Sequence, residues 1–411
     1  MNGTQSVNLL DKKMKNIKIF ILEKPWWIQI LSIIVATIIF IEIFGLIGTK
    51  ILGPTIGWGD EVLKYWDVYK ADNWEGRFVR WDAGYYLGIA QNGYRINGDE
   101  RAFFPLYPLL CRFISKLTSI SLLWSGFFIS VLSFIASVLV FYRWVLIDYT
   151  PQVAFLSVLW ICVFPMSFFF VAFYPEALFL LLSILSIYFA RRGRFIIGGL
   201  AIALAGASRP QAFLLAIPFI MEFLQQRNFS TAQLLKFGTG VLIAPMGMIG
   251  YLGFISFQSG SANLFLSYMS IHASDWNRYI TWPWLSLFDQ LRSIFLGIDI
   301  NKDWFSRVIV VQDLFYTLLG GVLAIWSISK LRLSSALFLI SSMLFYMANH
   351  GPYGYAFWSM PRWVASLYPL YLGLALITLK LPVFFRWLFI AISVILLGLL
   401  SAWFVTGRWV A

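Results

Sequence analysis

The sequence predicts an all-α membrane protein whose single domain, residues 1–411, is a bundle of about eleven transmembrane helices. Of its 411 residues, 60% are hydrophobic and only 12% are charged, whereas about a quarter are charged in a soluble protein. Several apolar runs reach the roughly 20 residues that a membrane-spanning helix needs. These runs do not alternate polar and apolar residues, so a transmembrane β-barrel is excluded.

The charge of the chain fits a membrane better than a nucleic acid. The formal net charge is +12, but the basic residues are scattered along loop edges and form no basic stripe. Membrane topology and anionic lipid head groups explain such a distribution, so we expect no nucleic-acid partner. The two cysteines, Cys111 and Cys162, are far apart in apolar surroundings and give neither a disulfide nor a metal-ligand pattern.

Two basic clusters set the expected orientation. Residues 1–24 contain five lysines, which predicts a cytoplasmic N-terminus, and residues 191–194 read Arg-Arg-Gly-Arg. The first apolar stretch is too long for a signal peptide and has no small-residue cleavage site, so we expect a retained first span. The expected spans are 26–47, a run ending at 146, 153–170, 176–191, 195–208, 211–224, 237–257, 305–328, 336–347, 363–379 and a run ending near 405.

Spans five and six are short and meet at Arg209-Pro210, where proline would break a helix. Two separate spans or one kinked element over 195–224 both fit the sequence. The segments 49–119 and 259–303 are long and polar, and the acidic residues of the first place it on the outer side. Within it, residues 102–119 are amphipathic and are expected to form an interfacial helix.

The stretch 80–94 is a polar and aromatic island in this apolar chain. At helical spacing, Asp82, Tyr85 and Tyr86 share one face, and Trp81 and the tyrosines are residue types that settle at the membrane–water boundary. Asp82 is therefore the candidate general base, which would take a proton from a water-soluble group while a lipid-borne partner approaches. The alternative is an interfacial helix whose acid merely faces water.

Two ordered blocks in this region resemble a known family. The pair Trp81-Asp82, the run 87–94 (LGIAQNGY) and the run 102–108 (AFFPLYP) are similar to the eukaryotic GPI mannosyltransferase II family and its prokaryotic relatives. Further stretches that look like this family are Tyr174-Pro175-Glu176, Ser208-Arg209-Pro210-Gln211, and Arg362 followed by Tyr368-Pro369.

The resemblance implies the GT-C fold with its catalytic aspartate in the first outer loop. It also implies a polyprenyl-phosphate sugar donor, classically dolichyl-phosphate mannose, and a glycan or glycolipid acceptor on the outer or lumenal face. The membrane would be the plasma membrane in a prokaryote and the endoplasmic reticulum in a eukaryote. A lipid phosphate is a good leaving group, so a cationic side chain suffices to stabilise it, and we expect neither a cofactor nor a required metal.

Arginine suits that phosphate because its planar fork makes paired, charge-assisted hydrogen bonds. Arg209 and Arg362 stand in otherwise uncharged outer turns, although each could be a snorkelling side chain. Glu176 could bind substrate or respond to the dipole of its helix. The expected substrate-binding residues are Trp81, Tyr85, Tyr86, Arg101, Arg112, Glu176, Arg209, His272 and Arg362.

Other interpretations remain at this point. His272 has no paired ligand nearby in sequence and also fits a plain interfacial histidine. Trp282 and Trp284 could stack on a sugar or belong to an aromatic belt. Glu42 and Asp313 lie within spans, where acids are functional hypotheses by default. A transporter or lipid flippase is the alternative function, and it would favour inverted repeats and midplane charges; a non-catalytic scaffold would need no outer carboxylate.

Overall fold

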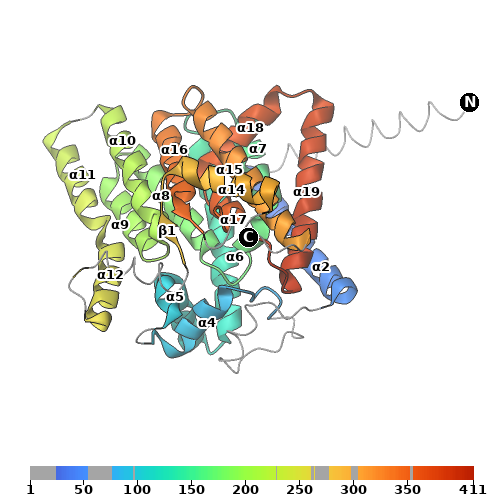
Figure 1. The fold of residues 1–411 in the computed structure, drawn as a ribbon. Helices are drawn as coiled ribbons and strands as arrows, with labels where there is room; N and C mark the ends of the chain where they lie inside the picture. The colour runs from blue at the N-terminus through green and yellow to red at the C-terminus, as the bar shows by residue number, and fades with distance from the viewer. Residues whose placement is uncertain are drawn as a thin grey trace, which may run out of the picture.

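The protein is a bundle of helices in a computed structural model (Figure 1). The structure describes residues 25–53, 76–95, 98–227, 229–260, 263, 277–297, 304–351 and 355–411. His272 and most of the acids of the first outer segment, in the stretch 54–75, lie outside these described residues.

The helices follow the apolar runs of the sequence. The first half contains α2 (Trp26–Leu52), α4 (Ala83–Asn92), η2 (Asp99–Ala102), α5 (Leu106–Thr118), α6 (Leu122–Val145), α7 (Pro151–Val163), η3 (Ser167–Phe170), α8 (Glu176–Arg191) and α9 (Phe195–Gly206). The second half contains η4 (Pro210–Leu215), α10 (Ala216–Gln226), α11 (Thr231–Ile243), α12 (Met246–Ser259), β1 (Tyr279–Ile280), α14 (Pro283–Leu296), α15 (Trp304–Ser327), α16 (Leu333–Ala348), β2 (Asn349–His350), α17 (Met360–Ala365), α18 (Tyr368–Lys380) and α19 (Val383–Val405).

Within the described residues, five helical segments are long and apolar enough to cross a membrane: α2, α6, α11 with α12, α15 and α19. Four shorter helices, α7, α9, α16 and α18, are also apolar. The protein is therefore an integral membrane protein with an all-α bundle, apart from the short antiparallel pair of β1 with β2. The count of eleven spans stays a prediction, because only these five of the described helical segments are long enough to cross a membrane.

Three helices differ from the expected spans, and proline accounts for two of these differences. The third span ends at Val163 and not at residue 170, since Phe164 precedes Pro165 and takes an extended conformation. The expected span 237–257 is broken into α11 and α12 next to Pro245. The expected span 363–379 is also two helices, because the chain is extended at Leu367, just before α18.

The segment 195–224 forms two antiparallel helices and not one kinked element. The side-chain nitrogen of Gln226, at the end of α10, donates to the carbonyl of Ala190 near the end of α8 (2.6 Å). The guanidinium of Arg191 lies 3.7 Å from the carboxylate of Glu222 on α10. Both ends of the segment therefore meet at the C-terminal end of α8, and the chain turns back near Arg209.

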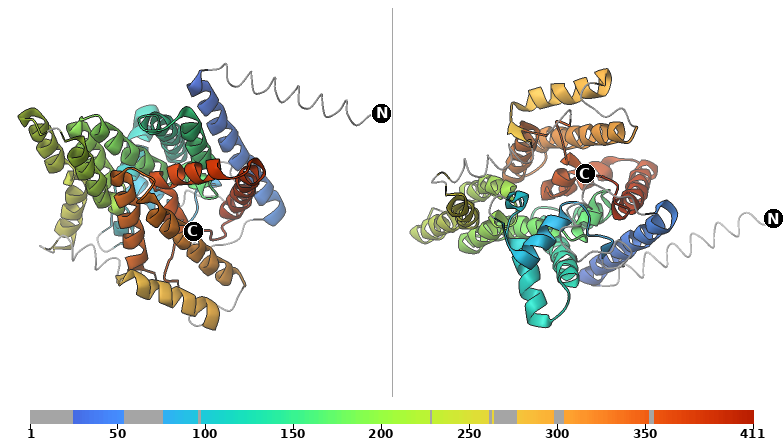
Figure 2. Two further views of the ribbon diagram at one scale, coloured as in Figure 1. Left: turned by 90° about the horizontal axis from the view of Figure 1, so that it is seen from above. Right: turned by 60° about the horizontal axis from the view of Figure 1, so that its bottom comes forward.

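The bundle has a buried middle and two flanks. Helix α8 packs against α6 and α9, and α7 packs against α18, while α2 pairs with α19 along one side. A Cβ atom on Gly48 would stand 2.7 Å from the carbonyl oxygen of Ala402, so glycine permits this close approach of α2 and α19. Figure 2 shows α14, in gold, along the outside of the bundle, where it contacts α15 and α16.

Helices α4 and α5 lie together at the lower edge of Figure 1. Elsewhere in the bundle, Glu222 of α10 is fully buried and accepts hydrogen bonds from Arg332 (2.8 and 3.1 Å) and from the hydroxyl of Ser334. This buried carboxylate joins α10 to the start of α16.

The orientation expected from the basic clusters can be tested by cysteine labelling. Cys111 and Cys162 are both fully buried, so a background of labelled native thiols is not expected. We expect a Glu75→Cys variant to react with a membrane-impermeant maleimide in intact cells. An Arg194→Cys variant, at an exposed position, should react only after the membrane is opened. The reverse pattern would contradict the proposed orientation.

Candidate active site

The backbone before α4 takes a strained turn that presents Asp82. Trp81 has a φ of 55°, a left-handed conformation that is costly for a residue with a side chain. Asp82 follows as the N-cap residue of α4, yet its side chain caps no backbone N–H. The carboxylate is therefore available for a contact outside its own helix.

Three distant contacts hold this turn in place. The guanidinium of Arg80 donates twice to the carbonyl oxygen of Val405, from Nε (2.9 Å) and from Nη2 (2.8 Å). The hydroxyl of Tyr174 donates to the carbonyl of Arg80 (2.7 Å). The ring of Trp81 meets the edge of Trp409 at a centroid distance of 4.7 Å. The end of α19 and the loop before α8 thus both fix the residues next to Asp82.

Arg362 reaches Asp82 from the other half of the chain. Its Nη1 donates to Oδ2 of Asp82 at 2.5 Å, and Arg362 is 9% exposed. It lies in α17, which follows Ser359 with a φ of 69°. Burial lowers the pKa of Arg362, but the carboxylates of Asp82 and Glu176 outweigh burial and raise this pKa above its ordinary value. The guanidinium therefore stays charged.

Glu176 and Arg209 extend this pair into a row of four alternating charges. Oε1 of Glu176 lies 3.5 Å from Nε of Arg362 and accepts a hydrogen bond from Nη1 of Arg209 at 2.5 Å. The remaining nitrogens of Arg209 face Gln211, whose amide oxygen, when turned toward them, accepts at 2.8 and 3.2 Å. We call Asp82, Arg362, Glu176 and Arg209 the ionic cluster.

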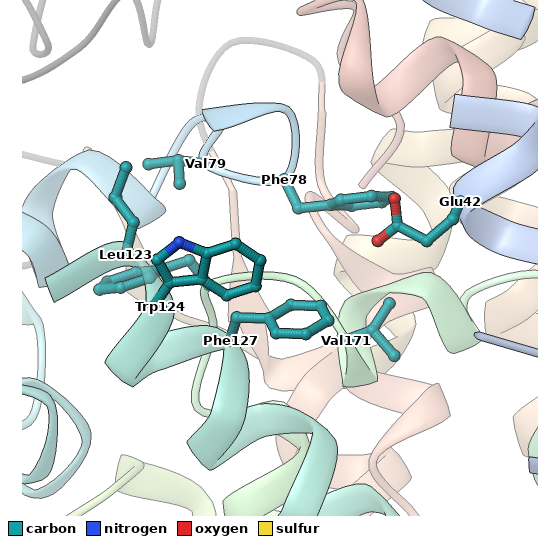
Figure 3. A pocket seen from close by; sticks show the side chains of 8 residues that line it. Glu42, Phe78, Val79, Leu123, Trp124, Phe127 and Val171 are labelled. Carbon is teal, nitrogen blue, oxygen red and sulfur yellow. The ribbon is translucent and has the colours of Figure 1, made fainter. Parts of the chain in front are cut away.

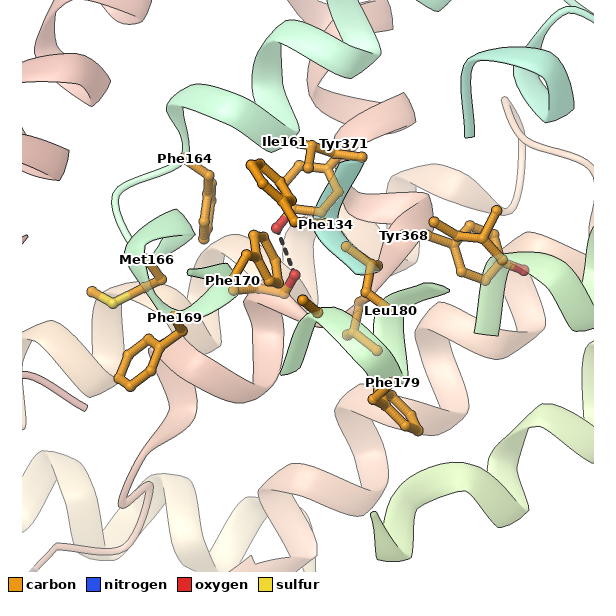
Figure 4. Close-up of a cluster of buried hydrophobic side chains, with 14 of the residues drawn as sticks. Phe134, Ile161, Phe164, Met166, Phe169, Phe170, Phe179, Leu180, Tyr368 and Tyr371 are labelled. Atoms are coloured by element: carbon orange, nitrogen blue, oxygen red, sulfur yellow. Dashed lines mark hydrogen bonds between the residues drawn. The ribbon is translucent and has the colours of Figure 1, made fainter. Parts of the chain in front are cut away.

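Aromatic rings line the ionic cluster. Arg362 lies over the rings of Phe169 (5.8 Å) and Tyr174 (5.5 Å), and Arg209 lies over Phe179 (5.8 Å). Phe169 of η3 and Phe179 of α8 belong to the buried hydrophobic cluster that is drawn in Figure 4. Cations are attracted to the faces of such rings, so these rings favour two guanidinium groups in an otherwise apolar interior.

The charges of the ionic cluster sum to zero, with two carboxylates against two guanidinium groups. An isolated charge in a protein interior costs several kcal/mol, roughly, and survives there only with a partner. Glu176 is 2% exposed and Arg209 is 6% exposed, so pairing is a condition of their burial. The interpretation of Arg209 and Arg362 as snorkelling side chains is therefore wrong.

The two tyrosines of α4 lie beside Asp82 in different settings. Tyr86 is 7% exposed and packs edge-on against Phe103, while Tyr85 is half-buried and stacks on Phe103 (4.5 Å). Burial, with the charge of Glu176, raises the pKa of Tyr86, and burial, with nearby acids that include Asp82, raises the pKa of Tyr85. Both rings thus stay neutral and form an apolar wall next to the carboxylate.

The other two expected arginines make backbone contacts near the site. Arg112 donates to the carbonyls of Ala90 (2.6 Å) and Gln91 (2.5 Å), which are unsatisfied at the end of α4. Arg101 donates to the carbonyl of Gly98 at 3.1 Å. Both therefore support the loop around α4, and neither joins the ionic cluster.

Four other candidates, which the structure describes, lie apart from the ionic cluster: Trp282, Trp284, Asp313 and Glu42. Trp282 and Trp284 stack on each other (4.9 Å) and are 63% and 60% exposed, which fits an aromatic belt. Asp313 is buried in α15, and Glu42 lies 3.9 Å from Arg77. His272 falls outside the described residues.

Glu42 also lines a pocket, which Figure 3 shows next to the first outer segment. Its walls are otherwise apolar and come from the segment before Asp82, from α6 and from the loop before α8: Phe78, Val79, Leu123, Trp124, Phe127, Val171 and Phe173. None of the four residues of the ionic cluster lines this pocket, so it is a separate hollow beside the site.

Sequence reasoning missed the residues that hold the site together. Arg80 and Gln211 stood inside the quoted motifs, next to Trp81 and Arg209, and this adjacency was the available signal. Tyr174, whose hydroxyl donates to the carbonyl of Arg80, also stood inside a quoted motif, whereas the carbonyl of Val405 that accepts from Arg80 has no signal in the sequence. Among the described residues, no three His, Cys, Asp or Glu side chains gather as a metal site would require.

Comparison with known families identifies the chain. Residues 28–347 match the sequence model of the mannosyltransferase (PIG-V) family. The chain belongs to this family. The resemblance seen in the sequence motifs is thereby confirmed, and nothing in the comparisons favours a transporter.

Curated relatives are similar over part of their length. The chain is 29% identical over 273 residues to the GPI alpha-1,6-mannosyltransferase 2 of Rattus norvegicus, a match that covers 62% of this chain and 52% of the relative. It is 31% identical over 171 residues to the human enzyme of the same name, covering 39% of this chain and 34% of the relative. The chain thus spans about half of the rat relative at most.

A solved structure supports the fold. The crystal structure of ArnT from Cupriavidus metallidurans bound to undecaprenyl phosphate matches 93% of this chain and 77% of its own, with a TM-score of 0.51 and 12% identity. The expected GT-C architecture is therefore confirmed at the level of the fold.

The contact between Arg80 and Val405 predicts a measurable loss of stability. An Arg80→Met variant removes two charge-assisted hydrogen bonds and leaves a buried carbonyl without them. Each hydrogen bond to a charged group contributes roughly 1.5–3 kcal/mol. We expect a clearly lower midpoint of thermal unfolding in detergent, whereas Arg194→Met, at an exposed position, should match the parent. An unchanged midpoint for Arg80→Met would show that the turn before α4 is held by other contacts.

Proposed function

We propose that this protein is a membrane mannosyltransferase that moves a sugar from a polyprenyl-phosphate donor to a hydroxyl group of a glycan or glycolipid acceptor. The observation that carries the proposal is the contact of Asp82 with Arg362 inside a membrane bundle of the PIG-V family. In this proposal Asp82 is the proton acceptor and Arg362 is the cation that meets the phosphate, and their contact supports a shared role in the transfer.

In the proposed reaction, an acceptor oxygen attacks the anomeric carbon of the sugar. A carbon–oxygen bond forms to the acceptor, and the bond between that carbon and the phosphate oxygen breaks. The electron pair of the broken bond stays on the phosphate, and the proton of the acceptor hydroxyl passes to Asp82. A positioned base of this kind typically contributes ~10²–10⁴-fold to the rate.

Arg362 is the better of the two cluster arginines for the phosphate. Its Nε lies 3.5 Å from Oε1 of Glu176 but forms no hydrogen bond in the described part of the chain, whereas the guanidinium of Arg209 donates to Glu176 and faces Gln211. A guanidinium fork binds phosphate oxygens through paired, charge-assisted hydrogen bonds. We therefore assign the donor phosphate to Arg362, with Arg209 in support through Glu176. ArnT, which has a similar fold, is solved with undecaprenyl phosphate bound, which supports a lipid-phosphate donor here.

The depth of the ionic cluster suits a lipid-linked donor. Glu176 begins α8, a helix of 16 residues that ends at Arg191 and is therefore about 24 Å long. A hydrocarbon core is about 30 Å thick. With Arg191 at one boundary of this core, Glu176 at the other end of α8 would still lie inside it, and so would the ionic cluster. A phosphate on a prenyl chain could reach it from the bilayer. We place this end of the bundle, with α4 and α5, on the non-cytoplasmic side.

The catalytic assignment predicts the effect of Asp82→Asn. This change keeps volume and polarity but removes the ability to accept a proton. Purified protein would be incubated with polyprenyl-phosphate mannose and candidate glycolipid acceptors, and transferred mannose would be measured. We expect the rate to fall by roughly 10²-fold or more in protein that still folds, because Glu176 remains 3.5 Å from Arg362 as its partner.

Asp99→Asn is the matched control, because Asp99 is an exposed acid of the same outer segment and should matter little to transfer. Transfer by Asp82→Asn at the parent's rate would overturn the assignment of the base.

A second prediction concerns metal ions. Because an arginine is proposed to meet the charge of the leaving phosphate, we expect transfer to continue after the protein is treated with EDTA and dialysed. The measurement is the same transfer assay before and after chelation. Activity that is lost with EDTA and returns with Mg²⁺ or Mn²⁺ would contradict this proposal.

A further inference from the structure

Glu176 occupies an unusual place in the ionic cluster, because both guanidinium groups approach the same oxygen atom. Oε1 accepts from Arg209 at 2.5 Å and lies 3.5 Å from Arg362, while Oε2 has no hydrogen-bond partner in the structure. Glu176 is 2% exposed. A buried carboxylate that leaves one oxygen unpaired gains less from its contacts than it could, so its place calls for an explanation beyond stability.

The geometry shows what Glu176 does to Arg362. With Asp82 on one side and Glu176 on the other, Arg362 stands between two carboxylates and is not committed to Asp82 alone. Arg209 neutralises Glu176, so Arg362 remains available as the counter-charge of Asp82. A phosphate that binds Arg362 would then weaken its hold on Asp82, and Asp82 would become a better proton acceptor when the donor is bound.

The charges of the phosphate and of Asp82 change during the proposed reaction, and this change gives Glu176 a second effect. The donor is a phosphodiester with one negative charge, and the product phosphate can carry two, while Asp82 becomes neutral when it takes the proton. Negative charge thus moves from Asp82 to the phosphate during transfer. The total charge of the ionic cluster decides how readily Asp82 takes a proton and how tightly the product is held.

We infer that Glu176 is a positioning residue that acts through Arg209 and Arg362 to keep the ionic cluster electrically neutral, which sustains the basicity of Asp82 and limits the affinity of the site for the product polyprenyl phosphate. This inference rests on the proposed function. Without Glu176 the cluster carries one net positive charge, and without Arg209 it carries one net negative charge.

Among the described residues, the groups that face Asp82 or Glu176 include no other side chain that would titrate near neutral pH. They are two arginines and four tyrosines: Arg209, Arg362, Tyr85, Tyr86, Tyr107 and Tyr174. Burial raises the pKa of each of these tyrosines, so all four stay neutral. A fall in the transfer rate at low pH would therefore report on protonation of the carboxylates.

The test uses Glu176→Gln, Arg209→Gln and the double variant in the full-length protein in detergent. The first measurement is the affinity for undecaprenyl phosphate, which requires no turnover. One unit charge at about 10 Å changes such an affinity about tenfold in a partly polar interior. We expect Glu176→Gln to bind about tenfold more tightly than the parent, Arg209→Gln to bind correspondingly more weakly, and the double variant to return close to the parent.

The second measurement is the pH dependence of mannose transfer. The acidic limb should move to lower pH in Glu176→Gln, because Asp82 then faces an excess positive charge and binds its proton less tightly. It should move to higher pH in Arg209→Gln and return in the double variant. A purely structural role of Glu176 would lower stability and activity together, without opposite shifts and without their cancellation.

Folded Glu176→Gln protein that binds undecaprenyl phosphate no more tightly than the parent would overturn the inference. If Glu176→Gln does not fold, the comparison of Arg209→Gln with the double variant decides, and a double variant that binds as weakly as Arg209→Gln overturns it. Failure of the proposed function is seen separately, since the parent would then transfer no mannose while the comparison of binding affinities still reports on Glu176.

Discussion

The cost of placing a charge in an apolar interior governs this structure. Glu176, Arg209 and Arg362 are each at most 9% exposed, and a charge removed from water is tolerated only with a partner close by. Because these residues come from three separate parts of the chain, their pairing requires the start of α8, the turn after α9 and the helix α17 to meet. The same four side chains therefore form the proposed active site and join the helices to one another.

Aromatic residues and backbone carbonyls make that pairing possible. Phe169 and Phe179 offer ring faces to the two guanidinium groups, and Arg80 ties the residues before Asp82 to the end of α19. Two residues that are not glycine, Trp81 and Ser359, take positive φ values close to the two ends of the Asp82–Arg362 contact. Strained backbone of this kind persists where the surroundings over-determine it, and such sites are often functional.

The sequence was sufficient for the class of fold and for the members of the ionic cluster, and insufficient for their arrangement. Apolar runs predict a membrane bundle, and Asp82 stood out for the helix face that it shares with Tyr85 and Tyr86. Glu176, Arg209 and Arg362 stood out as charges in sparsely charged stretches. Helix ends were less predictable, because Pro165 and Pro245 interrupt runs whose hydrophobicity continues through them. The contact of Arg80 with Val405 joins residues 325 positions apart, and no local pattern encodes such a distance.

The contact between Arg80 and Val405 also bears on how the protein is made. A membrane protein is synthesised from its N-terminus, and its helices enter the bilayer largely in that order. The turn that presents Asp82 belongs to the first fifth of the chain, yet its support comes from the end of α19. A nascent chain that carries only the early helices therefore contains Asp82 but lacks the contact with α19 that holds the turn before it in place. The turn is fully supported only when α19 has been inserted, so under the proposed function partly made chains should not consume a lipid-linked donor.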